Sequence, residues 1–224
     1  MSDGDLRPNS FWRERWEQNQ IAFHQAEVNP LLEQYWASLA LDAESPVFVP
    51  LCGKSRDMHW LREQGHRVVG VELSPIACRD FFVDAGMEPR LFDHGGFRAY
   101  EADGYRLLCG DLFALRTVDL EGVGAVFDRA SLFAFPAAQR RDYVRAMGNV
   151  LSPGARTLLL TFEYETGTMT GPPFSVTEEE VLDLYGGAFD VEQLSHAGGF
   201  PAGPRFEPRG LETIALAAYR LEKR

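Results

Sequence analysis

The chain has 224 residues, of which 45% are hydrophobic and 25% charged, a balance typical of a globular protein with one full hydrophobic core. Its formal net charge of −11 repels nucleic-acid phosphates and anionic lipid headgroups, so we expect neither a nucleic acid nor a membrane as a partner. The N-terminus lacks an apolar signal-peptide core, and no stretch is long enough to span a bilayer. The three cysteines lack the paired spacing of a zinc site or a disulfide framework. We therefore expect a cytoplasmic protein with reduced thiols and no bound metal.

Hydrophobic periodicity predicts helices near the N-terminus and then alternating strands and helices. Residues 1–9 are polar and turn-prone, Trp12 and Trp16 lie four apart on one helical face, and Asn29-Pro30 caps a helix that extends to Leu39. Apolar runs predict strands at 47–51, 68–72, 125–128 and 157–162. A helical pattern follows each of these strands: the first ends at residue 65, and the others cover residues 74–86, 137–151 and 177–186.

Three further segments complete the predicted architecture. Residues 98–108 contain Asp103-Gly104 between short apolar runs, which predicts a hairpin near the sheet edge. The last strands are expected at 189–194 and 213–219, separated by a Gly/Pro-rich loop at 197–210 that is long enough to cover a substrate. The pattern predicts an α/β fold with a mostly parallel sheet, helices on both faces and an antiparallel strand at one edge. Ligands bind such sheets at the carboxyl ends of the strands.

The best local signal for a ligand is an acidic residue at a strand end. Gly53 follows the first strand and Glu72 ends the second, a spacing at which a carboxylate accepts hydrogen bonds from ribose hydroxyls. A solvated or helix-capping role for Glu72 is the alternative. The turn Pro50-Leu51-Cys52-Gly53-Lys54 has one glycine where a dinucleotide fingerprint needs three, so an NAD-dependent oxidoreductase fits poorly. A nucleoside without phosphates fits better, and the common cosubstrate of that kind is S-adenosylmethionine.

Six segments in order resemble the thiopurine S-methyltransferase family. They are Phe11-Trp12 with Trp16, Ile21 to Gln25, Val49 to Ser55, Gly65-His66 with Val69 to Ser74, Asp128-Arg129-Ala130, and Gly171-Pro172-Pro173-Phe174. The resemblance extends from Phe11 to Tyr219 and is thin across residues 87–106 and 195–212.

The resemblance implies a single domain over residues 1–224 with the Rossmann-like class I methyltransferase fold, whose sheet has seven strands, one of them antiparallel. Residues 1–9 would be a disordered lead-in and residues 10–45 a helical cap over the cofactor site. The implied reaction transfers a methyl group from S-adenosylmethionine to the thiol of thiopurines, or to related small thiol, selenium or tellurium compounds, and yields S-adenosylhomocysteine. A monomer suffices for this reaction. A non-catalytic S-adenosylmethionine-binding module remains the alternative.

The resemblance also assigns residues to the two ligands. Cofactor contacts are expected from Trp12, Trp16, Leu51, Glu72, Asp111, Leu112 and Arg129. Acceptor contacts are expected from Phe23, His24 and Arg205, with Arg205 favouring the thiolate as a catalytic residue.

Each assignment has a structural alternative. The tryptophans could be the apolar face of a docked helix, Leu51 a core residue, Asp111 an N-cap, and His24 a hydrogen-bonded structural residue. Arg129 follows a buried strand, so either the cofactor carboxylate or a protein acid such as Asp128 must pair with it. Arg205 could be a solvated loop residue, and Lys54 is expected to be exposed on its turn rather than to face an anionic substrate.

Overall fold

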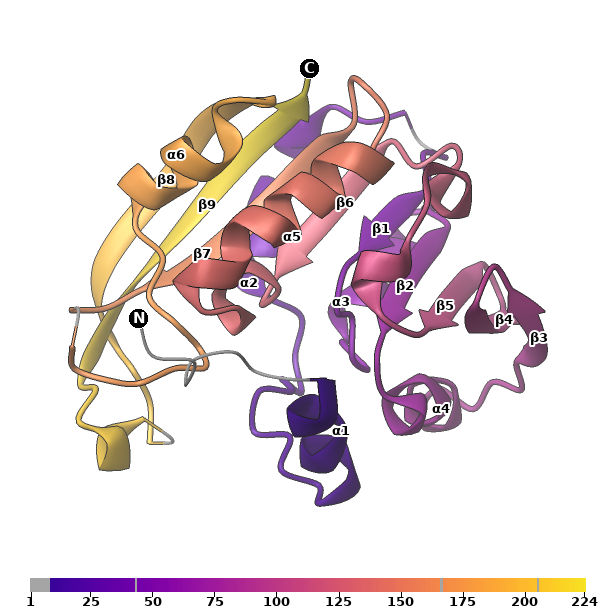
Figure 1. Ribbon diagram of the computed structural model, residues 1–224, viewed down its shortest axis with the longest axis horizontal. Coiled ribbons are helices and arrows are strands. Elements are labelled where there is room, and N and C mark those ends of the chain that lie inside the picture. The colour runs from indigo at the N-terminus through magenta and orange to yellow at the C-terminus, as the bar shows by residue number, and fades with distance from the viewer. Residues whose placement is uncertain (1–8, 43, 166, 205) are drawn as a thin grey trace.

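A nine-stranded mixed sheet forms the centre of the computed structural model, which describes residues 9–42, 44–165, 167–204 and 206–224 (Figure 1). Within these ranges the strands lie in the order β3-β4-β5-β2-β1-β6-β7-β9-β8. The strands are β1 Val47–Val49, β2 Val68–Glu72, β3 Arg90–His94, β4 Phe97–Ala102, β5 Tyr105–Cys109, β6 Ala125–Arg129, β7 Arg156–Glu163, β8 Phe189–Pro201 and β9 Thr213–Lys223.

Three of the helices begin at polar side chains that the sequence indicated. Asn29 accepts a hydrogen bond from the Leu31 amide (2.9 Å), and the hydroxyls of Ser74 and Thr177 cap the two other predicted helix starts. The α-helices are α1 Asn9–Glu17, α2 Pro30–Tyr35, α3 Asp57–Glu63, α4 Pro75–Asp84, α5 Ala137–Val150 and α6 Glu178–Tyr185. Short 3₁₀ helices are η1 Trp36–Leu39, η2 Leu112–Ala114, η3 Thr117–Leu120, η4 Leu132–Ala134 and η5 Glu207–Arg209.

Helices cover both faces of the sheet, and the alternation of side chains along the strands decides which core each residue enters. Phe48 and Val126 face the core covered by α5 and α6. Their neighbours Val47, Val49 and Phe127 face the core covered by α2, η1, α3 and α4. The predicted α/β sheet with helices on both faces is therefore confirmed. The expected count of seven strands with one antiparallel is wrong, because the described sheet has nine strands and both β4 and β9 run antiparallel to their neighbours.

The two edges of the sheet differ in detail from the prediction. The antiparallel strand β9 lies between β7 and β8 rather than at the edge, because β8 folds back along β9. At the other edge the predicted hairpin forms as β4 and β5, and the unpredicted β3 pairs with β4. Strand β8 continues to Pro201 through two register shifts, so the predicted loop 197–210 begins as strand. Bulges break the alternation that reveals a strand in sequence.

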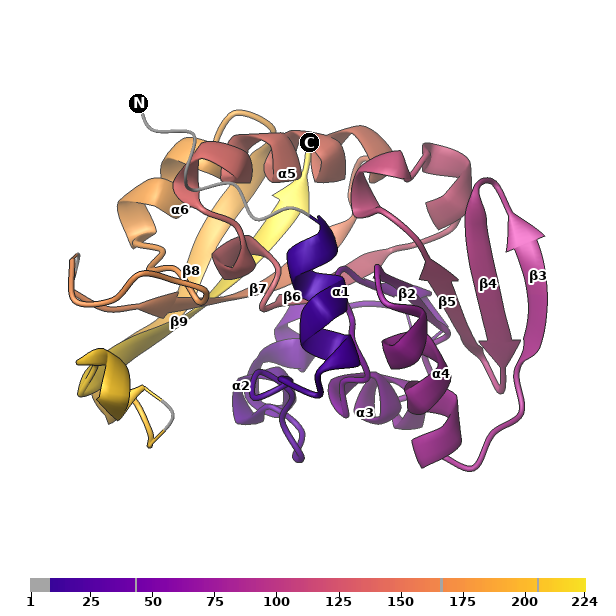
Figure 2. The same ribbon diagram turned by 60° about the horizontal axis from the view of Figure 1, so that its bottom comes forward.

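The carboxyl ends of the central parallel strands meet at one side of the sheet. Strand β1 lies between β2 and β6, so the chain leaves β1 toward one half of the sheet and later returns to the other. Helix α1 lies across these strand ends (Figure 2). The site that these strand ends form is therefore enclosed by the N-terminal segment.

Among the helices of the described ranges, none is both long and apolar enough to cross a membrane.

Two glycines of the framework predict opposite effects on stability. A Cβ at Gly70 of β2 would lie 2.6 Å from Cys52 Sγ and 2.7 Å from Leu107 Cδ2, so Gly70→Ala should lower the free energy of unfolding by about 1–3 kcal/mol. A Cβ at Gly148 in α5 would lie 3.9 Å from Phe189, an ordinary contact, and Gly148→Ala should raise it by up to about 1 kcal/mol through helix propensity. Urea unfolding of both variants measures this, and effects of the same sign would contradict the packing described.

Candidate functional site

A cavity of about 890 Å³ opens where the carboxyl ends of the central strands meet the N-terminal segment. Every predicted site residue that the structure describes lines it: Trp12, Trp16, Phe23, His24, Leu51, Glu72, Asp111, Leu112 and Arg129. Arg205 lies outside the described residues. Residues that are far apart in the sequence thus meet in one cavity, as the rule for strand ends predicted.

Glu72 is buried at the end of β2 and held by backbone amides. The Gly53 amide donates to Oε2 (2.9 Å) and the Ser74 amide donates to Oε1 (2.7 Å), while the residue is only 6% exposed. Burial raises the pKa of Glu72, and these N–H groups oppose that rise. Each carboxylate oxygen keeps capacity for a further donor. The solvated alternative for Glu72 is therefore wrong, and its carboxylate can accept hydroxyl donors in the cavity.

The turn after β1 forms the part of the cavity wall next to Glu72. Leu51 and Gly53 both adopt positive φ (45° and 53°), and a Cβ at Gly53 would lie 3.4 Å from the Trp16 ring. The buried Trp16 indole therefore packs on the backbone of this turn. Phe23 meets Trp12 and Trp16 edge-to-face, with ring centroids 5.9 and 5.7 Å apart. Trp16 thus docks α1, as its structural alternative proposed, and it also lines the cavity.

Arg129 is paired with an acid that the sequence did not indicate. Its Nε lies 3.1 Å from Asp57 Oδ2 on α3, and its side chain is 13% exposed in the cavity wall. The suggested protein partner, Asp128, is wrong, because Asp128 lies on the other side of the strand and accepts a hydrogen bond from the Tyr143 hydroxyl (2.6 Å). Burial raises the pKa of Asp128 to about 6. An arginine with one acidic partner suits a cavity that receives a second anion.

Two further polar residues of the cavity have structural partners. Asp111 caps η2 by accepting from the Phe113 amide (2.9 Å), as the structural alternative proposed, and also accepts from Asn9 Nδ2 of α1 (2.8 Å). Lys54 is not exposed as expected. Its side chain is 16% exposed because Nζ pairs with Asp84 (2.8 Å). The Asp111 carboxylate thus links the start of α1 to η2, and Asp111 and Leu112 both line the cavity.

His24 faces the cavity among positive charges. Burial lowers the pKa of His24, and the nearby charges of Lys54, Arg56 and Arg129 lower it further. The imidazole is therefore neutral at pH 7 and presents one donor and one acceptor nitrogen. A neutral imidazole of this kind can accept a hydrogen bond from the thiol of a molecule bound in the cavity.

The far lobe of the cavity is aromatic and was not assigned from the sequence. Phe162 lies between Phe133 and Phe206, with ring centroids 6.0 and 5.6 Å away. Arg209 lies at the rim and donates to the carbonyl oxygens of Pro172 (3.0 Å) and Thr170. The only sequence signals were the Gly-Pro-Pro-Phe segment and the Gly/Pro-rich loop, neither of which specifies these contacts. This lobe can hold a flat apolar ring beside a positive charge.

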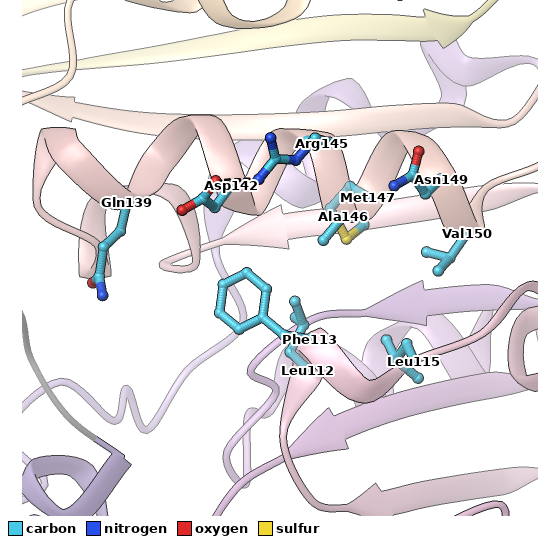
Figure 3. Close-up of a pocket in the computed structure, with 10 residues that line it drawn as sticks. All are labelled: Leu112, Phe113, Leu115, Gln139, Asp142, Arg145, Ala146, Met147, Asn149 and Val150. Atoms are coloured by element: carbon cyan, nitrogen blue, oxygen red, sulfur yellow. Dashed lines mark hydrogen bonds and ion pairs between the residues drawn. The ribbon is translucent and has the colours of Figure 1, made fainter.

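A second hollow, of about 400 Å³, lies between η2 and α5 (Figure 3). It shares Leu112 and Phe113 with the main cavity and is otherwise lined by side chains such as Met147 and the ion pair of Asp142 and Arg145. Apart from Leu112, it contains none of the predicted site residues. The chemistry is therefore concentrated in the larger cavity.

Comparison with known proteins gives consistent matches over the whole chain. The family described as thiopurine S-methyltransferase matches residues 7–224. The chain is 46% identical to the thiopurine S-methyltransferase of Nitrosospira multiformis, covering 96% of this chain and 97% of the relative. It is 44% identical to that of Xanthomonas axonopodis pv. citri, covering 96% and 99%.

Solved structures match at the level of the fold. A methyltransferase from Burkholderia thailandensis, solved with 1,6-didemethyltoxoflavin and S-adenosylhomocysteine, has a TM-score of 0.63 at 17% identity and covers 100% of this chain and 94% of its own. An S-adenosylmethionine-dependent methyltransferase from Anabaena variabilis has a TM-score of 0.65 at 15% identity and covers 100% and 98%. The expected Rossmann-like class I methyltransferase fold is thereby confirmed.

The surroundings of His24 predict its titration. Its side chain should titrate below the usual value of about 6.5, and Lys54→Met should raise the midpoint part of the way by removing one positive charge. Because the folded-state pKa is lowered, the unfolded chain binds more protons below pH ~6.5, so this group makes the protein less stable as the pH falls through that window. NMR titration of the imidazole carbon-bound protons measures the midpoint. A midpoint at or above 6.5 would contradict the burial and charges described.

Proposed function

Because the chain belongs to the thiopurine S-methyltransferase family, we propose that it transfers the methyl group of S-adenosylmethionine to the sulfur of a small aromatic or heterocyclic thiol. The thiol loses its proton, its sulfur forms a bond to the methyl carbon as the methyl–sulfonium bond breaks, and the products are a thioether, S-adenosylhomocysteine and a proton. The observation that carries this proposal is the continuity of the cavity. Its strand-end half has the groups that suit an adenosyl amino acid, and its aromatic half has room for a flat acceptor beside them.

The strand-end half fits the cosubstrate by the chemistry of its side chains. When bound, S-adenosylmethionine supplies a methyl group already activated on a sulfonium, so the protein needs no nucleophile of its own. Glu72 accepts hydrogen bonds from the ribose hydroxyls, Arg129 pairs with the amino-acid carboxylate, and the Trp16 ring suits a sulfonium cation. Trp12 and Leu51 complete the enclosure, and the segment Asp111-Leu112 borders the adenine.

The acceptor half must align the sulfur, exclude water and favour its deprotonated form. Phe133, Phe162 and Phe206 provide apolar surface, while Phe23 and the neutral His24 cover the cavity from the N-terminal segment. The positive charge of Arg209 at the rim lowers the cost of a thiolate in this apolar lobe. Residues 10–45 would then act as a cap over the cofactor, within a single methyltransferase domain.

The acceptor class and the setting complete the proposal. The relatives are named for thiopurines, and thiopurines or related thiols fit the aromatic lobe by shape, with selenium and tellurium analogues as an extension of the same chemistry. Cys52, Cys78 and Cys109 are free thiols, which accords with action in the cytoplasm. A monomer contains the whole cavity.

The proposal is tested by binding and by turnover. Calorimetric titration should show that S-adenosylmethionine and S-adenosylhomocysteine bind and that NAD does not. Addition of 6-mercaptopurine should then give a methylated product detectable by mass spectrometry. Binding without turnover on any aromatic thiol would favour a non-catalytic S-adenosylmethionine-binding module. Failure of both adenosyl ligands to bind would overturn the proposal.

Glu72→Gln tests the ribose contact. The amide keeps only one accepting atom, so it cannot serve the amides of Gly53 and Ser74 and also two hydroxyl donors. We expect S-adenosylhomocysteine to bind about 10- to 100-fold more weakly, as for the loss of a hydrogen bond to a charged group. Glu179→Gln on the exposed face of α6 is the matched control and should bind normally. Unchanged affinity in Glu72→Gln would exclude Glu72 from the site.

A further inference from the structure

Asp57, the first residue of α3, joins three separate segments of the chain beneath the cavity. Its Oδ1 accepts from the backbone amide of Asn29 (2.8 Å). Its Oδ2 accepts from the Ser55 hydroxyl (2.9 Å) and lies 3.1 Å from Arg129 Nε. Asp57 is only 1% exposed, so these partners, and not water, satisfy the oxygens of its carboxylate. One buried carboxylate thus connects the turn after β1, the end of β6 and the N-terminal segment.

The pairing of Asp57 with Arg129 leaves part of the guanidinium available. Asp57 forms an ion pair with Nε, and among the described residues the structure records no other ion pair and no hydrogen bond for the Arg129 side chain. The guanidinium is planar, so a fixed Nε also fixes the direction of the two terminal nitrogens. Arg129 lines the cavity and its side chain is 13% exposed. The terminal nitrogens are therefore held ready for an anion in the cavity.

We propose that Asp57 is a positioning residue: one oxygen of its carboxylate directs Arg129 toward the carboxylate of the cosubstrate, and the other oxygen holds the N-terminal segment in place. This inference rests on the proposed function. The hydrogen bond to Asn29 anchors the segment whose preceding residues include Phe23 and His24, both at the cavity. Correct placement of Arg129 and closure of the acceptor side therefore depend on one carboxylate.

Comparing the binding of two ligands distinguishes a role of Asp57 in positioning Arg129 from a purely structural role. S-adenosylhomocysteine carries the amino-acid group that Arg129 would bind, whereas 5′-methylthioadenosine shares the adenosine and lacks that group. In Asp57→Asn the amide nitrogen must face a donor, either the Asn29 amide or the Arg129 guanidinium. In both orientations Arg129 loses its charged partner, so its direction is held less strongly. The amino-acid group of S-adenosylhomocysteine carries both a carboxylate and an ammonium. Loss of the negative charge of Asp57 favours binding of the first and disfavours binding of the second, so it gives the ligand no net electrostatic gain.

Calorimetry on the full chain should show that Asp57→Asn weakens S-adenosylhomocysteine about tenfold and leaves 5′-methylthioadenosine within about twofold. Asp183→Asn, which removes a carboxylate paired with Arg141 at the surface, is the matched control and should bind both ligands normally. Equal weakening of the two ligands, or unchanged or tighter binding of S-adenosylhomocysteine, would overturn the inference. If the wild-type protein binds neither ligand, it is the proposed function that fails.

A double-mutant cycle tests whether Asp57 acts through Arg129. Arg129→Ala should weaken S-adenosylhomocysteine selectively, and adding Asp57→Asn should weaken it by no more than about twofold further. Additive losses would show that Asp57 acts independently and would contradict the inference. If Asp57→Asn does not fold, Ser55→Ala decides the question, since it removes one donor to the carboxylate. About threefold selective weakening is then expected, and no selectivity would overturn the proposal.

Discussion

The burial of the Glu72 carboxylate at the end of β2 is the constraint on which the site depends. Removing this group from water raises its pKa, and the two amide donors of Gly53 and Ser74 offset that cost. One donor requires the turn after β1 to curl back with positive φ at Leu51 and Gly53. The other requires α4 to begin directly after the strand. The shape of both loops therefore follows from the need to solvate one acid.

Helix α1 completes the cavity through a few contacts rather than a large apolar interface. Helix α1 buries only Trp16, which packs on the turn that holds Glu72. Asn9 donates to Asp111 at its start, and the amide of Asn29 donates to Asp57 farther along. An element with so little buried surface has low local stability. The contact between Asn9 and Asp111 therefore helps to fix where α1 lies over the strand ends.

The sequence predicted the strand-end half of the site because that half obeys local rules. A buried apolar run followed by Glu72 or Arg129 marks a position at the carboxyl edge of a parallel sheet. The partner of Arg129 could not be found in this way, because Asp57 at the start of a helix is indistinguishable from an ordinary helix-start acid. Strand β3 and the end of β8 were missed for a different reason. Edge strands and bulges interrupt the alternation of apolar and polar side chains that reveals a strand in the sequence.

The acceptor half follows a different logic, which explains why it could not be assigned from sequence. Its small hydrophobic cluster joins Phe162 of β7 to Phe206 and to residues of the loops on either side. Loop positions are set by packing among side chains from distant segments, not by periodicity. The cosubstrate half is built from strand ends that the sheet fixes, whereas the acceptor half is built from loops that can change without disturbing it. Substitutions in these loops can therefore alter the proposed acceptor half without moving the strand ends that line the proposed cosubstrate half.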